Sequence, residues 1–272
     1  MLNVAVIGMG WWGKTLVTAI GKSSKLRVVK GVKRNPATEA EFAREHKFEI
    51  ISDYSGVLKD PTIQGVVLCT PHTLHTEQII AAAKAGKHIF CEKPLSQKPA
   101  ECLDVIEAEM AAGARHVMLG FMRRYDRSYV EMKQALAAGT LGRALMMHNF
   151  HRNVETPAAD FTGAMAITNS APHEFDVVRH VLNAEFTSIT AMQPKRSDAR
   201  VAPVVMVLET DDGQLVTIEV NNNADYGYDV RAELVGEAGS IAMNNVAYSR
   251  TDMKLASATR YDADWRGRYH EA

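Results

Sequence analysis

Hydrophobic residues in the first 120 positions form short runs that alternate with segments of helical periodicity. Residues 4–7 are a continuous apolar run, which is typical of a strand buried on both faces of a sheet. Further strands are predicted over residues 26–32, 65–70, 87–91 and 116–119. Because strands that alternate with helices favour a parallel sheet covered on both faces, we predict an α/β domain with a doubly wound parallel sheet over residues 1–122.

The pattern changes near residue 143, where longer strands follow one another through turns. They are predicted over residues 144–153, 186–193, 203–209, 215–220, 229–235 and 240–243. A helix over residues 172–182 interrupts them and starts at Pro172, whose missing N–H costs little in a first turn. Asp211-Asp212-Gly213 is a hairpin signal between two of the strands. Residues 123–272 are therefore expected to form an α+β domain with a large, mostly antiparallel open sheet.

Residues 8–15 read GMGWWGKT and satisfy two phosphate-binding patterns at once. The glycines fit GxGxxG, which binds dinucleotides, and the same residues fit GxxxxGK[ST], which binds nucleoside triphosphates. Both patterns need a buried strand before the glycines and a helix after them, because the N–H groups at a helix N-terminus attract phosphate. Both conditions are met here, so the loop alone does not decide between the two ligands.

The other strand ends favour the dinucleotide. A triphosphate site needs magnesium, usually held by an aspartate at a strand end, but the strands here end in Cys69-Thr70 and in Cys91-Glu92, which Lys93 follows. A dinucleotide site needs a second strand that ends near the adenosine ribose. The strand over residues 26–32 ends at Lys33-Arg34, and cations there suit the 2′-phosphate of NADP, although NAD is possible.

Composition narrows the class of protein. The 272 residues carry a formal net charge of −1 without long charged blocks, so we expect no nucleic-acid partner and no membrane partner. Three cysteines (Cys69, Cys91 and Cys102) provide neither a disulfide framework nor a metal-type pairing. We expect a cytoplasmic protein that binds a small neutral or anionic ligand, without a bound metal. The exposed face of its second sheet needs a cover, which favours a homo-oligomer, either dimer or tetramer.

Five further segments carry a family resemblance. They read TPHTLH over residues 70–75, CEKP over 91–94, GFMRRYD over 120–126, HEFD over 173–176 and YGYD over 226–229. Together with the glycine loop they resemble the Gfo/Idh/MocA family of oxidoreductases, and its inositol dehydrogenase members in particular. The resemblance implies a Rossmann domain followed by a substrate domain, and hydride transfer between a nicotinamide and the hydroxyl of a polyol, cyclitol or sugar.

The predicted catalytic set is Lys93, His173 and Asn169, in which the resemblance implies Lys93 as the general acid/base and His173 as its proton relay. A lysine of ordinary pKa, about 10.4, is neutral in only about one molecule in 1,000 at about pH 7.4, but burial beside a cationic nicotinamide would lower that pKa. Lys93 follows the carboxyl end of a predicted parallel strand, where open α/β sheets place their ligands. Without the resemblance, Lys93 would be an ordinary turn lysine, and His173 with Asp176 a structural pair on a helix.

The same resemblance implies the remaining site residues. The cofactor-binding set is Gly8, Met9, Gly10, Trp11, Trp12, Gly13, Lys33, Arg34, Thr70, Pro71, His72, His75, Glu92, Lys93 and Arg123. The substrate-binding set is Lys93, Arg123, His151, Asn153, Asp176, His173 and Tyr228. Trp11 and Trp12 are expected either to cover the nicotinamide or to pack against the second domain.

Strand and helix periods place some of these side chains. A period of two puts His151 and Asn153 on one side of a strand and His148 on the other, which argues against a metal held by the two histidines. Asn169, His173 and Asp176 have helical spacings of four and three, so they are expected to share one stripe.

Two departures from the family pattern keep alternatives open. Many inositol dehydrogenases have aspartate where this chain has Asn169, and an amide hydrogen-bonds a hydroxyl but carries no proton at neutral pH. The family also continues beyond a point resembling residues 264–272. The alternatives are a dinucleotide-binding sensor or inactive relative, and a reductase of another keto-sugar or cyclic diol.

Overall fold

The computed structural model describes residues 1–243 except 114, 157–158, 199 and 226. Two compact units meet in the sequence between Phe121 and Met122. Residues 264–272, where the family resemblance predicts a continuing chain, lie outside the described residues, as does Tyr226 of the YGYD segment.

The first unit contains a six-stranded sheet with the order β3-β2-β1-β4-β5-β6. Its strands are β1 (Leu2–Ile7), β2 (Leu26–Val32), β3 (Glu49–Ile51), β4 (Gly65–Leu68), β5 (His88–Cys91) and β6 (Val117–Leu119). All neighbouring strands pair in parallel, which confirms the predicted doubly wound sheet. Strand β3 was not predicted, because three residues at a sheet edge give too short a run for a period to show.

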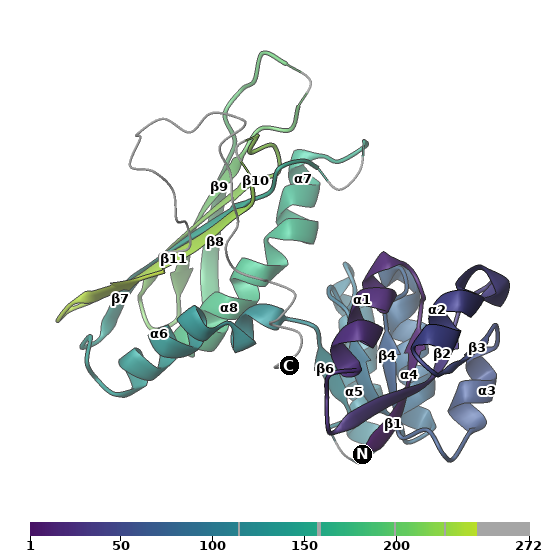
Figure 1. The fold of residues 1–272 in the computed structure, drawn as a ribbon. Helices are drawn as coiled ribbons and strands as arrows, with labels where there is room; N and C mark the ends of the chain where they lie inside the picture. The colour runs from purple at the N-terminus through teal and green to yellow at the C-terminus, as the bar shows by residue number, and fades with distance from the viewer. Residues whose placement is uncertain (114, 157–158, 199, 226, 244–272) are drawn as a thin grey trace. The chain divides into compact units, whose positions relative to one another are not determined.

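Helices cover both faces of this sheet (Figure 1). Successive side chains of β1 point to opposite faces, so the strand presents apolar residues to the helices on each side. Val4 and Val6 pack with residues of α1 and α2, whereas Ala5 and Ile7 pack with residues of α3, α4 and α5. The helices are α1 (Trp11–Ile20), α2 (Ala40–Glu45), α3 (Tyr54–Lys59), α4 (His75–Lys84) and α5 (Pro99–Ala111), with short turns η1 (Pro36–Glu39) and η2 (His72–Leu74). The apolar run of β1 therefore serves two cores.

The second unit contains a six-stranded sheet with the order β12-β11-β7-β10-β9-β8. Its strands are β7 (Ala144–Arg152), β8 (Phe186–Met192), β9 (Val204–Thr210), β10 (Leu215–Asn221), β11 (Asp229–Gly236) and β12 (Ser240–Ala242). The pair β7 and β10 is parallel, and the other pairs are antiparallel. The prediction of a mostly antiparallel open sheet is confirmed.

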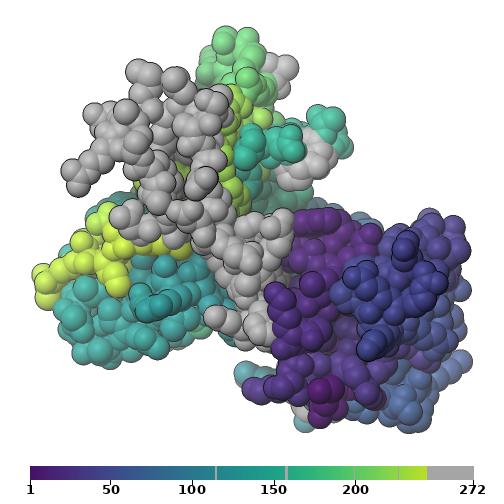
Figure 2. Space-filling view, in the orientation of Figure 1, coloured from purple at the N-terminus to yellow at the C-terminus, as the bar shows by residue number. Residues whose placement is uncertain are grey.

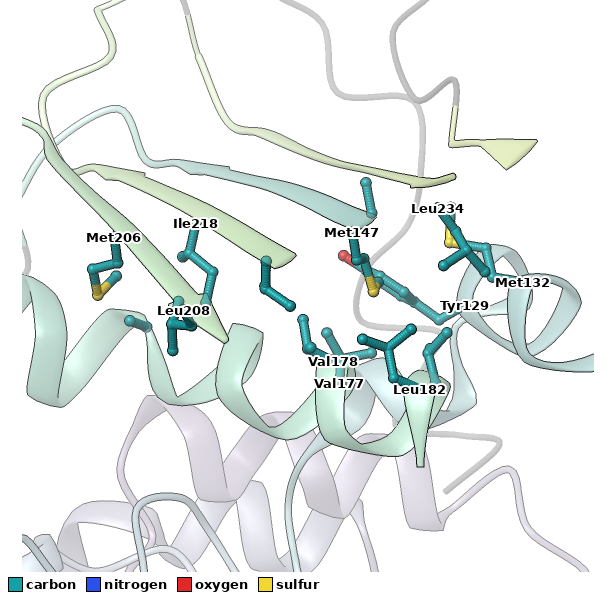
Figure 3. Packing of buried hydrophobic residues seen from close by; sticks show 14 of the residues in the cluster. Tyr129, Met132, Met147, Val177, Val178, Leu182, Met206, Leu208, Ile218 and Leu234 are labelled. Atoms are coloured by element: carbon teal, nitrogen blue, oxygen red, sulfur yellow. The ribbon is translucent and has the colours of Figure 1, made fainter. Parts of the chain in front are cut away.

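Helices of the second unit pack on one face of its sheet. They are α6 (Arg127–Ala137), α7 (Gly163–Met165) and α8 (Pro172–Leu182), with the turns η3 (Met122–Tyr125) and η4 (Ala166–Ser170). Figure 3 shows Val177, Val178 and Leu182 of α8 directed at the sheet residues Met147 and Leu208, in a core of buried side chains. This packing fixes the face of α8 that carries the polar residues described below.

None of the helices in the described part of the chain combines the length and the apolar character that crossing a bilayer requires.

Candidate active site

The glycine loop follows β1, where the strand order of the first sheet reverses: β2 lies on one side of β1, and β4 lies on the other. Gly8 has φ +94°, and a Cβ there would come within 2.6 Å of the Cys69 carbonyl oxygen. A Cβ on Gly13 would come within 2.1 Å of the Gly8 oxygen, while among the described residues a Cβ on Gly10 meets no atom within 4 Å. Gly8 and Gly13 thus allow a tight turn and close helix packing, and Gly10 leaves the backbone open to a pyrophosphate.

Helix α1 starts directly after Gly10, which has no side chain with which to cap it. The first-turn N–H groups of a helix attract phosphate when no side chain takes them. Of the other loop residues, Met9 is buried and Trp11 is 62% exposed. The loop therefore fits the diphosphate of a dinucleotide by its backbone.

The lysine and threonine of the GKT sequence make contacts inside the protein. Lys14 Nζ lies 3.2 Å from Glu39 Oε2, and Thr15 Oγ1 donates to the Trp11 carbonyl oxygen at 3.0 Å. Lys33, which follows β2, contacts the other oxygen of Glu39. Arg34 is exposed. The end of β2 is therefore a cluster of cations around one buried carboxylate.

His75 connects the turns that follow β4 and β5. Its Nδ1 lies 2.9 Å from the Pro94 carbonyl oxygen, and its Nε2 lies 2.9 Å from the Thr70 carbonyl oxygen. The ring is 1% exposed, and burial lowers the pKa of His75. A neutral ring donates to one of the two carbonyls at a time. Direct contact between His75 and a cofactor stays a prediction, and the geometry gives His75 a position from which it holds the turn containing Lys93.

The rest of the TPHTLH segment lies beside this histidine. Thr70 Oγ1 donates to Gln78 Oε1 at 2.6 Å. Pro71 is exposed and precedes the turn η2, which begins at His72. The side chains predicted to meet the cofactor thus stand at the carboxyl edge of the parallel sheet.

Glu92 and Lys93 follow β5 at this edge. Glu92 is 8% exposed, and burial raises its pKa to about 6, while a hydrogen bond from Trp12 and the charge of Lys93 act in the opposite direction. A Cβ on Gly120 would come within 2.9 Å of Glu92 Oε1, so glycine leaves the room that this carboxylate occupies. Trp12 therefore contacts Glu92, a contact that was not predicted.

The second unit contains a polar cluster, which we name the His151 cluster: the buried residues Arg123, Glu174, His151 and His173, and the half-buried residues Asn153 and Tyr228. Arg123 and Glu174 are 1% and 0% exposed and form an ion pair. His151 Nδ1 lies 3.0 Å from Glu174 Oε2, and His151 Nε2 lies 3.2 Å from Asn153 Nδ2. An ionised Glu174 would accept a hydrogen bond from His151 Nδ1, and Nε2 of a neutral ring would then accept from the Asn153 amide.

Two further predicted residues lie against His151. The ring of His173 is 6.1 Å from that of His151 between centroids, and the ring of Tyr228 is 6.2 Å away. His148 lies on the opposite face of β7, where its Nδ1 is 2.8 Å from Thr217 Oγ1, as the period of two predicted. Five substrate-site candidates, Arg123, His151, Asn153, His173 and Tyr228, thus belong to one cluster.

Asn169 does not continue helix α8. It lies in the π-helical turn η4, and α8 begins at Pro172. The predicted stripe of Asn169, His173 and Asp176 assumed one regular helix, and that assumption is wrong before Pro172. π-helical turns widen the helix and are frequent at functional sites.

Asp176 forms a bidentate ion pair with Arg124. Arg124 Nε lies 2.8 Å from Asp176 Oδ2, and Nη2 lies 2.5 Å from Oδ1. The carboxylate is 5% exposed and keeps further lone pairs that can accept from a hydroxyl.

Three residues of these sites were missed in the sequence: Glu39, Arg124 and Glu174. Glu174 had a usable signal, because it lies three and four residues before Val177 and Val178, on the face of α8 that enters the core. A charged residue at a core position must be paired. Glu39 and Arg124 gave no such signal, since neither stands in an apolar pattern.

Comparisons with known proteins agree with this geometry. A family model described as "Oxidoreductase family, NAD-binding Rossmann fold" matches residues 2–121, and one described as "GFO/IDH/MocA C-terminal domain" matches residues 129–242. The chain is 40% identical to inositol 2-dehydrogenase 2 of Saccharopolyspora erythraea, over 100% of this chain and 81% of that protein. It is 32% identical to inositol 2-dehydrogenase/D-chiro-inositol 3-dehydrogenase of Shouchella clausii, over 100% and 80%.

A solved structure shows the same fold. The myo-inositol dehydrogenase of Lactobacillus casei, in complex with NAD(H) and myo-inositol, superposes with a TM-score of 0.85 at 26% identity, over 96% of this chain and 79% of that one. The family models and the relatives extend through both units. The chain therefore belongs to the Gfo/Idh/MocA family of oxidoreductases, with an NAD-binding Rossmann fold as its first unit.

Proposed function

We propose that this protein transfers a hydride between a hydroxyl-bearing carbon of a cyclitol and a nicotinamide dinucleotide, as the inositol dehydrogenases that it resembles are named for doing. The observation that carries the proposal is the similarity to inositol 2-dehydrogenases over the whole of this chain and about four fifths of theirs. The His151 cluster supports it, because a ring of adjacent hydroxyls needs several donors and acceptors. The cluster offers imidazole groups on β7 and α8, with an amide and a phenol next to the ends of β7 and β11. Other polyols and sugars present the same hydroxyl chemistry.

Each residue has a proposed task. The nicotinamide, when bound, supplies the hydride acceptor or donor. Lys93 takes the hydroxyl proton as the general base, and His173 relays it. Asn169 orients a hydroxyl through its amide. Arg123, His151, Asn153, Asp176 and Tyr228 hold the remaining hydroxyls. Gly8, Gly10 and Gly13 hold the diphosphate by their backbone. The other residues of the predicted cofactor set contact the rest of the dinucleotide, except His75, which holds the turn that contains Lys93.

NADP is the proposed preferred dinucleotide. Lys33 and Arg34 follow β2, whose end serves the adenosine ribose in this fold, and a charge-assisted bond to the 2′-phosphate contributes roughly 1.5–3 kcal/mol. Calorimetry decides the preference. NADPH should bind more tightly than NADH, and Lys33→Asp should narrow or reverse the difference. Equal affinities of the wild type would refute it.

Turnover on a panel of inositols, polyols and sugars tests the reaction itself. NADPH or NADH formation with one of the inositols, at a rate well above that with linear polyols, is the expected result. Dinucleotide binding without turnover on any member would favour the sensor or inactive relative instead. Turnover only in the reverse direction, on a keto-sugar, would favour the reductase.

A homo-oligomer is proposed through the sheet of the second unit. The face opposite α8 exposes Met192, Val205 and Leu215 at 56%, 37% and 41%, and exposed apolar residues on a broad sheet favour an interface. Sedimentation should show that the wild type is a dimer or tetramer, and that the lysine introduced by Val205→Lys dissociates it.

The cytoplasm is the proposed compartment, because Cys69, Cys91 and Cys102 are all free thiols.

A further inference from the structure

Glu39 is an acidic residue inside the cluster of cations at the end of β2. It ends the turn η1 and lies beside α1, and both segments belong to the purple-to-blue surface of the first unit (Figure 2). Its two oxygens serve different lysines: Oε1 contacts Lys33, and Oε2 lies 3.2 Å from Lys14 Nζ. One carboxylate thus holds two ammonium groups from different segments.

The carboxylate and the ammonium groups differ in accessibility. The Glu39 side chain is 10% exposed, whereas those of Lys14 and Lys33 are 38% and 30% exposed. The hydrogen bond from Lys33 lowers the pKa of Glu39, so the negative charge persists throughout the neutral range. A ligand can therefore reach the lysines more readily than it can reach the carboxylate.

We propose that Glu39 is a specificity-determining residue that competes with the 2′-phosphate of NADP for Lys33 and Lys14, and so limits the preference for NADP over NAD. The inference rests on the proposed function, in which Lys33 serves the ribose end of the dinucleotide. A phosphate that contacts the same ammonium groups meets the repulsion of the fixed carboxylate. The uncharged 2′-hydroxyl of NAD meets no such repulsion, so Glu39 acts against one nucleotide only.

The opposite role, an acid that grips the ribose hydroxyls of NAD, fits the geometry less well. Both Glu39 oxygens already accept from lysines, and the side chain is nearly buried. A hydroxyl would have to displace an ammonium group from its counter-ion. A phosphate does not have to displace either lysine from Glu39, because it can contact the exposed sides of the two ammonium groups.

Calorimetry on Glu39→Gln tests the inference without any turnover. The isosteric amide removes the charge, so affinity for NADPH and for adenosine 2′,5′-bisphosphate should rise by about fivefold or more, while affinity for NADH and 5′-AMP stays within about twofold. Glu41→Gln is the matched control, because it removes the same charge two residues away on the exposed surface and should leave NADPH affinity within about twofold. Glu39→Ala should give the same direction as Glu39→Gln, which keeps the test open if the amide variant does not fold.

The rise in NADPH affinity of Glu39→Gln should depend on Lys33. In a Lys33→Ala background, Glu39→Gln should therefore raise NADPH affinity much less than it does alone. Unchanged or weaker NADPH binding in Glu39→Gln would overturn the inference, and so would a loss confined to NADH, which would assign the carboxylate to the ribose. The nucleotide preference of the wild type is judged separately. A wild type that prefers NADH, with a variant that still gains for NADPH, would refute the proposed NADP preference and leave the role of Glu39 standing.

Discussion

The ring Nδ1 of His75 lies 2.9 Å from the carbonyl oxygen of Pro94, so a buried side chain of helix α4 holds the turn in which Lys93 stands. His75→Leu removes this contact and also the contact between His75 Nε2 and the Thr70 carbonyl oxygen. We expect kcat to fall by at least about tenfold, because small displacements of a catalytic group are costly, while dinucleotide affinity stays within about threefold.

Steady-state kinetics and calorimetry on the same variant check this prediction, and His75→Gln, which can still donate, should recover part of kcat. His88→Leu is the control, since it makes the same change at the exposed start of β5. A loss of dinucleotide affinity as large as the loss of kcat would instead assign His75 to cofactor binding.

Lys93→Met should abolish most turnover and leave dinucleotide affinity within a few fold. The base acts on the substrate proton, so its removal lowers kcat by about 10²–10⁴ fold. Lys98→Met, on an exposed lysine five residues later whose side chain is 76% exposed, should keep wild-type rates. Retained activity in Lys93→Met would make Lys93 an ordinary turn lysine.

Asn169 separates a working enzyme from an inactive relative. If Asn169 only orients a hydroxyl, the wild type should turn over, His173→Ala should lower kcat by at least about tenfold, and Asn169→Asp should change the rate modestly. NADPH formation by the wild type and both variants is the measurement. A silent wild type that Asn169→Asp restores by orders of magnitude would show that the missing carboxylate disables the proton route.

Glu92 should make stability depend on pH. Its folded-state pKa of about 6 lies above the ordinary value because of burial, so the ionised carboxylate destabilises the fold above pH 6, and this cost disappears as pH falls through the unfolded-state pKa, near 4.3. Glu92→Gln removes the cost. The free energy of unfolding of the variant relative to the wild type should be higher at pH 7 than at pH 4 by about 2 kcal/mol. Urea unfolding at the two pH values measures this, and a difference independent of pH would contradict it.

Glu174→Gln should destabilise the second unit. Removing one partner of a buried ion pair leaves Arg123 charged in the core, which costs about 3–5 kcal/mol. Glu185→Gln breaks the pair between Arg179 and Glu185, whose side chains are 45% and 63% exposed, and should cost no more than about 1 kcal/mol. Thermal or urea unfolding of the two variants compares them. Equal small losses would mean that the pair in the core contributes no more than a surface pair.

The predicted strands agree with the structure wherever the apolar pattern was long enough to read. Helix α8 has the predicted bounds, and β7 was predicted to within one residue at its end. The prediction failed at β3, where three residues show no period, and at Asn169, where a π-helical turn replaces the regular helix. Local spacing is informative only while the backbone keeps one regular conformation.

By itself the sequence determined the two fold types, the glycine loop and the strand ends that carry Lys33 and Lys93, because these depend on periodicity and on residues close together in the chain. Only the tertiary structure decided which charged groups meet. Glu174 contacts Arg123 from 51 positions away and His151 from 23 positions away, and Asp176 meets Arg124 across 52 positions. The physical reason is that a buried charge must find an opposite charge or a hydrogen-bond partner, and the packing of helices on sheets, rather than the local sequence, decides which partner is within reach.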